Sequence, residues 1–234
     1  MYKTFKRVSD IIVSGIALLI LSPILIPIII GLKLTGEGYI WYKQKRVGYK
    51  NQYFAIWKFA TMLKDSPNMS GGIMTTAKDP RITPMGGFLR KSKINELPQL
   101  INIFKGDMSF VGPRPVMQIS FNAYPKEVQN VIYNVSPGLT GIGSIIFRDE
   151  EKIITNIKNN GGDTWGFYKN KIYPLKGELE HWYQVNQTLA LDFKILFATA
   201  YVILKPNTDI TLKLFPDLNQ YDQELKEMKK AAQR

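Results

Sequence analysis

The sequence contains no cysteine and a single histidine, His181. Without cysteine the chain has no disulfide, no thiolate metal site and no cysteine nucleophile. One histidine excludes a metal site built from several histidines. A serine–histidine catalytic pair lacks the G-x-S-x-G turn that would present its serine. We therefore interpret His181 as a structural residue.

Acidic residues are scarce. Against 31 Lys and Arg the chain has 19 Asp and Glu, a formal net charge of +12 over 234 residues. This excess favours a partner that carries phosphate, such as a nucleic acid, an acidic lipid or a nucleotide. The basic residues are scattered and no RNA- or DNA-binding motif is present, so we expect no nucleic-acid partner. The length fits one domain, or one domain and an anchor.

One long segment has no charge at all. Residues 11–32, "IIVSGIALLILSPILIPIIIGL", are twenty-two uncharged residues, enough at 1.5 Å per residue to cross the core of a bilayer. A cleaved signal peptide is the alternative, but the run is long, contains two prolines and lacks an A-x-A-like cleavage site at its end. The pattern predicts a membrane segment.

The middle of this segment predicts a bend. Ser22-Pro23 and then Pro27 remove backbone donors and disfavour straight helix just before each ring. Basic residues lie on both sides of the segment, which by the positive-inside rule places both ends on the cytoplasmic face: Lys3, Lys6 and Arg7 before it, and Lys33, Lys43, Lys45 and Arg46 after it. The flanks slightly favour a re-entrant hairpin over a kinked spanning helix in which Ser22 satisfies the freed carbonyls.

Downstream, alternating aromatic and polar residues over 39–62 predict two short strands, and residues 64–80 read as a loop. Thr83-Pro84 predicts the start of a helix that ends near residue 92. A second helix is marked by an apolar stripe and by Gly106 as its C-terminal cap, with Asn95 at the N-cap and Glu96 in the first turn. Its stripe consists of Leu97, Leu100, Ile101 and Phe104.

The last half of the chain is predicted mostly helical. Residues 116–135 read as helix, residues 139–147 as a turn and a short extended piece, and residues 220–234 as a charged helical tail. Residues 189–204 are strongly apolar but contain Asp192 and Lys194, so they predict a core or interfacial helix, since sixteen residues with two charges are a poor membrane span.

The region around Asn95 predicts an anion site. The first turn of a helix carries unpaired N–H groups and a partial positive charge, which stabilise phosphate. Mixed basic and acidic residues surround it in sequence, suited to a nucleotide diphosphate and a divalent ion: Arg81, Arg90, Lys91, Lys93, Asp107 and Arg114. A capped helix with a solvated basic face is the alternative.

The stretch "FLRKSKINELPQLINIFKGDMSFVGPRP" strongly resembles the bacterial sugar transferases, also called monotopic phosphoglycosyl transferases. Further matching stretches follow in the family's order: "FKRVSDIIVS", "YKQKRVG", "WKFATM", "DPRITPMGGFLRK", "SPGLTGIG" and "LALDFKIL". The resemblance implies an α+β, mostly helical fold. It divides the chain into a broken, re-entrant membrane anchor at 1–38, a cytosolic catalytic domain with interfacial helices and a small β element at 39–215, and a charged tail at 216–234.

The resemblance also implies an activity. Such enzymes move a sugar phosphate from a UDP-sugar to polyprenyl phosphate and release UMP, usually with Mg²⁺, at the cytoplasmic face of the bacterial inner membrane. The partners implied are the UDP-sugar, polyprenyl phosphate and membrane lipid. A homodimer is an alternative that the sequence leaves open.

The family's site residues map onto this chain. Asn95 and Glu96 stand at the catalytic and metal-binding pair. The substrate contacts fall on Lys58, Arg81, Arg90, Asp107, Pro113 and Arg114, and the break in the membrane helix falls on Ser22 and Pro23. Asp107 is expected to support the centre or the ion.

Asn95 departs from the family, whose aspartate at this position is the nucleophile that takes the phosphosugar. An amide can cap a helix but cannot attack phosphorus. Three explanations stay open: a substitution that traps a complex, a natural variant in which Glu96, Asp107 or direct transfer replaces the aspartate, and a protein that only binds. The alternative function is a noncatalytic basic protein of the membrane surface.

Overall fold

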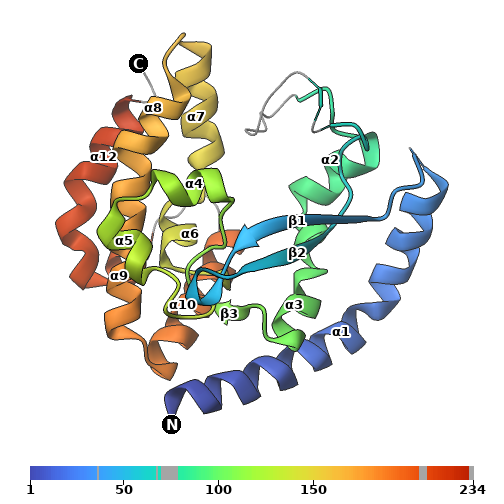
Figure 1. Ribbon diagram of the computed structural model, residues 1–234, viewed down its shortest axis with the longest axis horizontal. Coiled ribbons are helices and arrows are strands. Elements are labelled where there is room, and N and C mark those ends of the chain that lie inside the picture. Colours follow the sequence, from blue (N-terminus) through green and yellow to red (C-terminus); the bar gives the residue numbers. More distant parts are fainter. Residues whose placement is uncertain (36, 67, 70–78, 206–209, 232–234) are drawn as a thin grey trace. The chain divides into compact units, whose positions relative to one another are not determined.

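The computed structural model describes the whole chain except residues 36, 67, 70–78, 206–209 and 232–234 (Figure 1). The chain divides into two compact units. The first consists of residues 3–46 and 53–108 with Met1. The second consists of residues 47–52 and 109–234 with Tyr2.

The first unit combines the long apolar helix with a β-hairpin and two short helices. Its elements are α1 (Tyr2–Leu34), β1 (Trp41–Val47), β2 (Tyr53–Phe59), α2 (Pro84–Lys91), the 3₁₀ turn η2 (Ile94–Glu96) and α3 (Gln99–Lys105). Strands β1 and β2 form a two-stranded sheet, joined through the 3₁₀ turn η1 (Tyr49–Asn51). The two strands and the helix at residue 84 confirm the sequence prediction.

The C-terminal part of α1 is packed against the hairpin and α2. Ile28 and Leu32 form a buried cluster with Phe59 of β2 and Leu89 of α2, and Trp41 stacks on Phe59 with ring centroids 5.2 Å apart. Burial of such side chains contributes about 1.5–3 kcal/mol each. This cluster fixes β2, which carries Lys58, and α2, which directly precedes the predicted site in sequence.

Helix α1 runs without interruption in its assignment, although Pro23 and Pro27 lie inside it. Figure 1 shows its ribbon changing direction along its length. The Ser22 hydroxyl donates to the Leu19 carbonyl at 2.8 Å, the acceptor that Pro23, lacking an N–H, leaves unbonded. The bend agrees with the sequence prediction, and the Ser22 bond is the one expected for the alternative, a kinked spanning helix; the re-entrant path stays a prediction.

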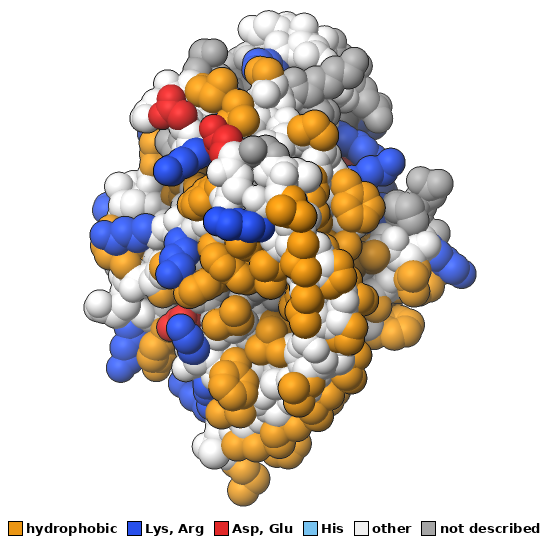
Figure 2. Space-filling view, turned by 90° about the vertical axis from the view of Figure 1, so that its right-hand side faces the viewer, with side chains coloured by type: hydrophobic (Ala, Val, Ile, Leu, Met, Phe, Trp, Pro, Cys, Tyr) orange, Lys and Arg blue, Asp and Glu red, His pale blue; other side chains and the backbone are white. Residues whose placement is uncertain are grey.

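Most of α1 exposes its apolar side chains. It is the one helix, among the described residues, long and apolar enough to cross a membrane, with a mean hydropathy of 2.6 over its best window, of which 11% is buried. Figure 2 views the molecule from the side on which α1 lies in Figure 1, and hydrophobic side chains crowd that face. Such a surface is unfavourable in water and suits a lipid environment.

The second unit is a helical assembly around a short parallel strand pair. Strands β3 and β4 pair in parallel, with Ser109 opposite Gly138 and Val111 opposite Thr140. The bounds are β3 (Ser109–Val111), α4 (Gln118–Ala123), α5 (Lys126–Val131), β4 (Gly138–Thr140), α6 (Ile142–Ile146), α7 (Glu150–Asn159), α8 (Thr164–Phe167), η3 (Tyr168–Ile172), α9 (Tyr173–Asn186), α10 (Leu189–Leu204), α11 (Thr211–Leu214), η4 (Pro216–Tyr221) and α12 (Asp222–Ala231).

The predicted helix over 116–135 is in fact two helices. Tyr124 is extended and precedes Pro125, and a residue before proline is disfavoured in the α region, so α4 ends there. The turn and extended piece predicted over residues 139–147 are extended only at their start, in β4, and continue as helix α6, so that prediction was wrong for residues 142–146. The apolar segment at 189 is α10, which Thr188 caps by accepting from the Leu191 N–H at 3.1 Å.

Candidate functional site

Asn95 does not cap a helix, so the N-cap prediction was wrong. It lies inside the 3₁₀ turn η2, whose N-cap is Lys93, while Pro98 is the N-cap of α3. Lys93 has a positive φ of 60°, a conformation that costs a non-glycine residue about 1–2 kcal/mol. The chain thus reaches α3 through a strained turn. Leu97 and Pro98 both have helical backbone angles and lead from this turn into α3.

The backbone donors of this turn are used locally. The Glu96 N–H donates to the Lys93 carbonyl and the Leu97 N–H to the Ile94 carbonyl, both at 3.1 Å. Helix α3 has only seven residues. The predicted anion site at a helix N-terminus is therefore corrected: these two amides are not available to a phosphate, and charge at the site has to come from side chains.

The Asn95 side chain is buried, with 7% of its surface exposed. Its Oδ1 atom has no hydrogen-bond partner. A buried carbonyl oxygen without a donor costs about 1–3 kcal/mol, so such groups are rare and concentrate at functional sites. This oxygen is therefore an unused hydrogen-bond acceptor at the predicted catalytic position.

Lys58 and Glu96 form an ion pair beside this turn. The Lys58 Nζ atom lies 2.8 Å from the Glu96 Oε1 atom, and both side chains are more than four-fifths buried. Lys58 comes from β2 and Glu96 from η2, so two elements far apart in sequence bring them together. The structure thus places Lys58, one of the residues predicted to contact substrate, directly against Glu96 of the predicted catalytic pair.

Arg81 is engaged elsewhere. Its guanidinium donates to both carboxylate oxygens of Asp79, at 2.9 Å and 2.6 Å, and to the Ser66 carbonyl at 3.2 Å. Hydrogen bonding from Arg81 lowers the pKa of Asp79 to about 2, and Arg90 adds a smaller effect of the same sign. Arg81 and Arg90 thus both lie near a carboxylate that the sequence analysis did not single out.

Asp107 is also bonded within the first unit. Its Oδ2 atom accepts from the Asn102 side-chain amide at 3.0 Å. Asn102 is fully buried on α3, and sequence reasoning missed it, because a polar residue on the far side of an apolar stripe reads as solvent-facing.

Pro113 and Arg114 belong to the second unit. The Pro113 carbonyl accepts from the Gly138 N–H at 2.8 Å, and the Arg114 carbonyl accepts from the Tyr133 hydroxyl at 2.8 Å. The same hydroxyl accepts from the Val116 N–H at 3.1 Å. The segment after β3 is therefore held by its backbone, as its two prolines suggested.

The buried Glu180 and the partly buried Glu150 lie near this segment, and neither role was predicted from the sequence. Burial raises the pKa of Glu180 to about 8, against weaker opposing effects from Lys176 and from the backbone N–H groups of Arg114 and Gly143. Glu150 pairs with Lys176 at 2.5 Å, and that ammonium with the Tyr168 hydroxyl and Arg114 holds the pKa of Glu150 below its ordinary value despite burial. Arg114 thus lies among titratable groups.

A divalent cation fits the chemistry of η2. Within the described residues no group of three or more His, Cys, Asp or Glu is gathered for a metal. Mg²⁺ in phosphate-transfer sites commonly uses one or two protein oxygens and completes its shell with phosphate and water. Asn95 Oδ1, buried and without a partner, and the neighbouring Glu96 carboxylate supply two such oxygens.

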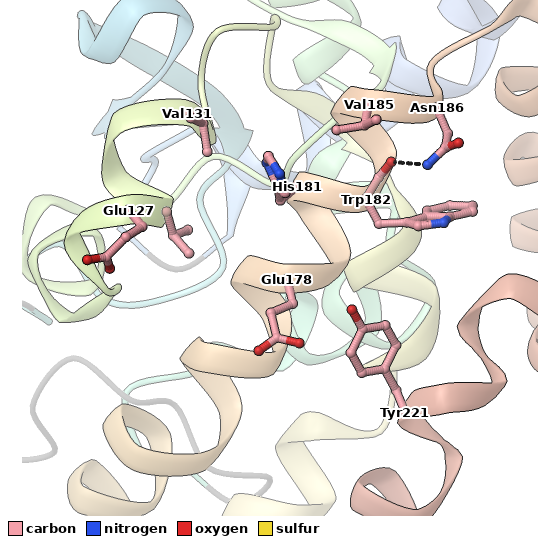
Figure 3. A pocket seen from close by; sticks show the side chains of 9 residues that line it. Glu127, Val131, Glu178, His181, Trp182, Val185, Asn186 and Tyr221 are labelled. Carbon is pink, nitrogen blue, oxygen red and sulfur yellow. Dashed lines mark hydrogen bonds between the residues drawn. The ribbon is translucent and has the colours of Figure 1, made fainter.

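A separate pocket lies within the second unit (Figure 3). It has a volume of about 600 Å³, and none of the residues predicted for the site lines it. Its walls come from α5, α9 and η4: Glu127, Val128, Val131, Glu178, His181, Trp182, Val185, Asn186 and Tyr221. His181, interpreted above as structural, is exposed there.

Comparisons with known proteins identify the family of the chain. A family profile described as "Bacterial sugar transferase" matches residues 1–206. The chain is 32% identical over 216 residues to an uncharacterized sugar transferase of Haemophilus influenzae, covering 86% of this chain and 41% of that protein. It is 32% identical over 215 residues to an undecaprenyl-phosphate galactose phosphotransferase of Salmonella typhimurium, covering 86% and 40%.

Shorter relatives match too. An exopolysaccharide production protein of Sinorhizobium fredii is 35% identical over 166 residues, 65% of this chain and 73% of that protein. The chain spans about two fifths of the length of the first two relatives. The family match covers most of the chain, including α1, the β1–β2 hairpin, η2 and the segment after β3. The chain belongs to the bacterial sugar transferase family.

Proposed function

We propose that this protein transfers a sugar 1-phosphate from a UDP-sugar to polyprenyl phosphate. In the overall reaction a phosphate oxygen of the lipid bonds to the β-phosphorus of the UDP-sugar. The bond from that phosphorus to the bridging oxygen breaks, and UMP leaves with the bridging oxygen. The named activities of the Salmonella galactose phosphotransferase and of a Klebsiella pneumoniae UDP-glucose:undecaprenyl-phosphate glucose-1-phosphate transferase support this class of reaction.

The observation that carries the proposal is the turn at Asn95. A buried amide oxygen without a partner lies next to Glu96, whose carboxylate contacts Lys58. We expect Glu96 and Asn95 to hold Mg²⁺, which neutralises charge on the diphosphate when bound. We expect Lys58, whose ammonium lies 2.8 Å from Glu96, to contribute a second positive charge that binds a phosphate of the donor.

The amide at position 95 closes one chemical route. A carboxylate there attacks the β-phosphorus and forms an acyl phosphate that the lipid phosphate then resolves, whereas the amide nitrogen and oxygen are poor nucleophiles. We propose that the protein with Asn95 binds the donor and transfers slowly, and that Asn95→Asp restores the covalent route. Because asparagine and aspartate have nearly the same shape, the substitution changes chemistry with little change in packing.

The test is release of UMP from a panel of UDP-sugars in the presence of undecaprenyl phosphate and Mg²⁺. We expect Asn95→Asp to be faster than the unaltered protein by at least about a hundredfold, in the range typical of a positioned catalytic group. Asn95→Asp with Glu96→Gln is the matched control and should lose this gain. Mass spectrometry after exposure to the UDP-sugar should detect a phosphosugar adduct on the aspartate variant alone. Silence of that variant with every donor would contradict the proposal.

We further propose that α1 enters the bilayer from the cytoplasmic side of a bacterial inner membrane and returns to it, with the rest of the chain on that side. Basic residues on both sides of the apolar run and the bend at its prolines support this path. Cysteine substitutions at Lys3 and Lys45 should both react with a membrane-impermeant maleimide in inside-out vesicles only. Reaction from opposite sides would mean a spanning helix.

The alternative is a noncatalytic protein that binds acidic membranes through its net charge of +12. Such binding falls steeply with salt and does not select a nucleotide. Saturable, Mg²⁺-dependent binding of a UDP-sugar at 0.3 M salt favours the transferase. Binding to anionic vesicles alone, lost at that salt, favours the alternative.

A further inference from the structure

The side chain of Asn102 makes three hydrogen bonds, all inside the first unit. Its Oδ1 atom accepts from the Trp57 backbone N–H at 2.9 Å. Its Nδ2 atom donates to the Ala55 carbonyl at 2.8 Å and to Asp107 Oδ2 at 3.0 Å. The residue is 0% exposed. A fully buried amide with every one of these bonds in place is a fixed structural link, since losing any of them leaves a buried group unpaired.

The partners determine which way the amide faces. A backbone N–H can only donate, and a carbonyl or a carboxylate oxygen can only accept. Turning the amide over would place its NH₂ against the Trp57 N–H and its oxygen against two acceptors. Asp107 therefore selects the orientation in which Asn102 bonds the strand.

Asn102 takes the place of a neighbouring strand at the edge of β2. Ala55 and Trp57 are two residues apart, so the carbonyl of one and the N–H of the other point to the same edge of the strand. One side-chain amide that accepts from the second and donates to the first reproduces the pair of bonds that another strand would make. The hairpin is only two strands wide, and this contact attaches β2 to α3.

The link lies next to the ion pair of the site. Lys58 follows Trp57 directly in β2, and Glu96 lies in the turn that leads into α3, the helix that carries Asn102. The distance between Lys58 and Glu96 therefore depends on how β2 is held against the start of α3. A shift of β2 along the helix by a single residue would carry the Lys58 side chain to the other face of the strand.

We propose that Asn102 is a positioning residue: its side-chain amide, oriented by Asp107, holds β2 against α3 and so sets the Lys58 ammonium against Glu96. Its bearing on catalysis rests on the proposed function, whereas its bearing on the Lys58–Glu96 contact does not. Asp107, expected from the sequence to support the catalytic centre or the ion, acts on it through Asn102 and β2.

The contact itself is tested on the full-length protein without any substrate. A water-soluble carbodiimide joins an amine and a carboxylate that touch, so it should link Lys58 to Glu96, and the linked peptides are quantified by mass spectrometry. We expect Asn102→Asp to reduce this cross-link at least about threefold and to speed hydrogen exchange of residues 53–59. Asn102→Asp combined with Asp107→Asn restores one donor between the two side chains and should recover part of the cross-link. An unchanged cross-link in Asn102→Asp would overturn the proposal.

The effect on turnover is tested by a double-mutant cycle in the Asn95→Asp protein, with UMP release as the readout. Asn102→Asp alone should slow turnover about 10- to 100-fold, the usual range for a residue that orients a ligand-binding group. Added to Lys58→Met it should change turnover less than about twofold, because the group it positions is already absent. Its effect on the thermal midpoint should be the same in both backgrounds. If the effects of Asn102→Asp and Lys58→Met on turnover multiply, Asn102 acts independently of Lys58.

Leu218→Ala is the control for lost stability, since Leu218 is fully buried in the second unit and should lower the midpoint without lowering turnover. A weakened cross-link with no UMP release by any variant would leave the positioning contact standing and remove the transferase. An unchanged cross-link in Asn102→Asp, together with UMP release by the Asn95→Asp protein, would support the transferase and overturn the positioning role of Asn102. The two proposals therefore fail separately.

Discussion

The buried carboxylate of Glu180 predicts an unusual dependence of stability on pH. The side chain is 1% exposed, and burial raises its pKa from 4.5 to about 8. Between these values the folded protein holds a proton that the unfolded chain has released. Stability therefore falls as pH rises through this window, the opposite of the usual behaviour of a paired carboxylate.

The size of the effect follows from linkage. A proton held only by the folded state changes the free energy of unfolding by about 1.4 kcal/mol per pH unit. From pH 6 to 7.5 the loss is about 2 kcal/mol, which for a chain of this size corresponds to about 4–8 °C in the thermal midpoint. Glu180→Gln keeps the shape and an acceptor for the Arg114 and Gly143 N–H groups but cannot ionise, so it removes this slope.

The assay is the thermal midpoint in detergent at pH 6.0, 6.75 and 7.5, for the unaltered protein, Glu180→Gln and Glu178→Gln. Glu178 lies on the same helix but is exposed, so its variant should follow the unaltered protein. We expect the thermal midpoint of Glu180→Gln, relative to that of the unaltered protein, to increase by about 4–8 °C as the pH rises from 6.0 to 7.5. Parallel curves for all three proteins would refute the assignment of a raised pKa to Glu180.

Two further predictions concern the first unit. Arg7 donates to the Ile103 and Phe104 carbonyls at 2.6 Å and 2.7 Å, at the C-terminal end of α3. Arg7→Gln should therefore lower stability by about 1–2 kcal/mol, measured as a shift of the thermal midpoint, and Arg7→Lys should recover part of the loss because its charge still faces the helix dipole. An unchanged midpoint in Arg7→Gln would mean that α1 does not hold α3 in this way. The Thr83 hydroxyl accepts from the Gly86 N–H at 3.0 Å. Thr83→Ala should lower the free energy of unfolding by about 1 kcal/mol, whereas Thr83→Ser should change it little. Equal thermal midpoints for the two variants would argue against the cap.

The elements that the sequence predicted well are those set by local chemistry. Thr83-Pro84 begins α2, Gly106 ends α3 with a φ of 101°, and the prolines of the apolar segment bend α1. Each depends on one or two residues whose backbone preferences dominate their surroundings. The resemblance supplied the family, which the comparison over residues 1–206 bears out.

The elements that the sequence predicted poorly depend on neighbours distant along the chain. Asn95 is of a residue type that caps helices, yet it follows the left-handed Lys93 and Ile94 inside a 3₁₀ turn. Asn102 is buried because β2, more than forty residues earlier, needs a partner at its edge. Glu180 is buried because the glycine at 143 lets the backbone approach its carboxylate. Hydrophobic periodicity in the sequence does not reveal a polar residue that is buried by tertiary contacts.

The identity of residue 95 links the stability of the site to its chemistry. An uncharged amide is cheaper to bury than a carboxylate, and Asn95 Oδ1 has no donor that would compensate a negative charge. We therefore expect Asn95→Asp to gain activity and to lose about 1–3 kcal/mol of stability in EDTA. Mg²⁺ at millimolar concentration should raise the thermal midpoint of Asn95→Asp more than that of the unaltered protein, because a cation compensates the new charge. Equal responses of the two proteins to Mg²⁺ would mean that the oxygens at position 95 do not face the ion, and the metal assignment would then rest on Glu96 alone.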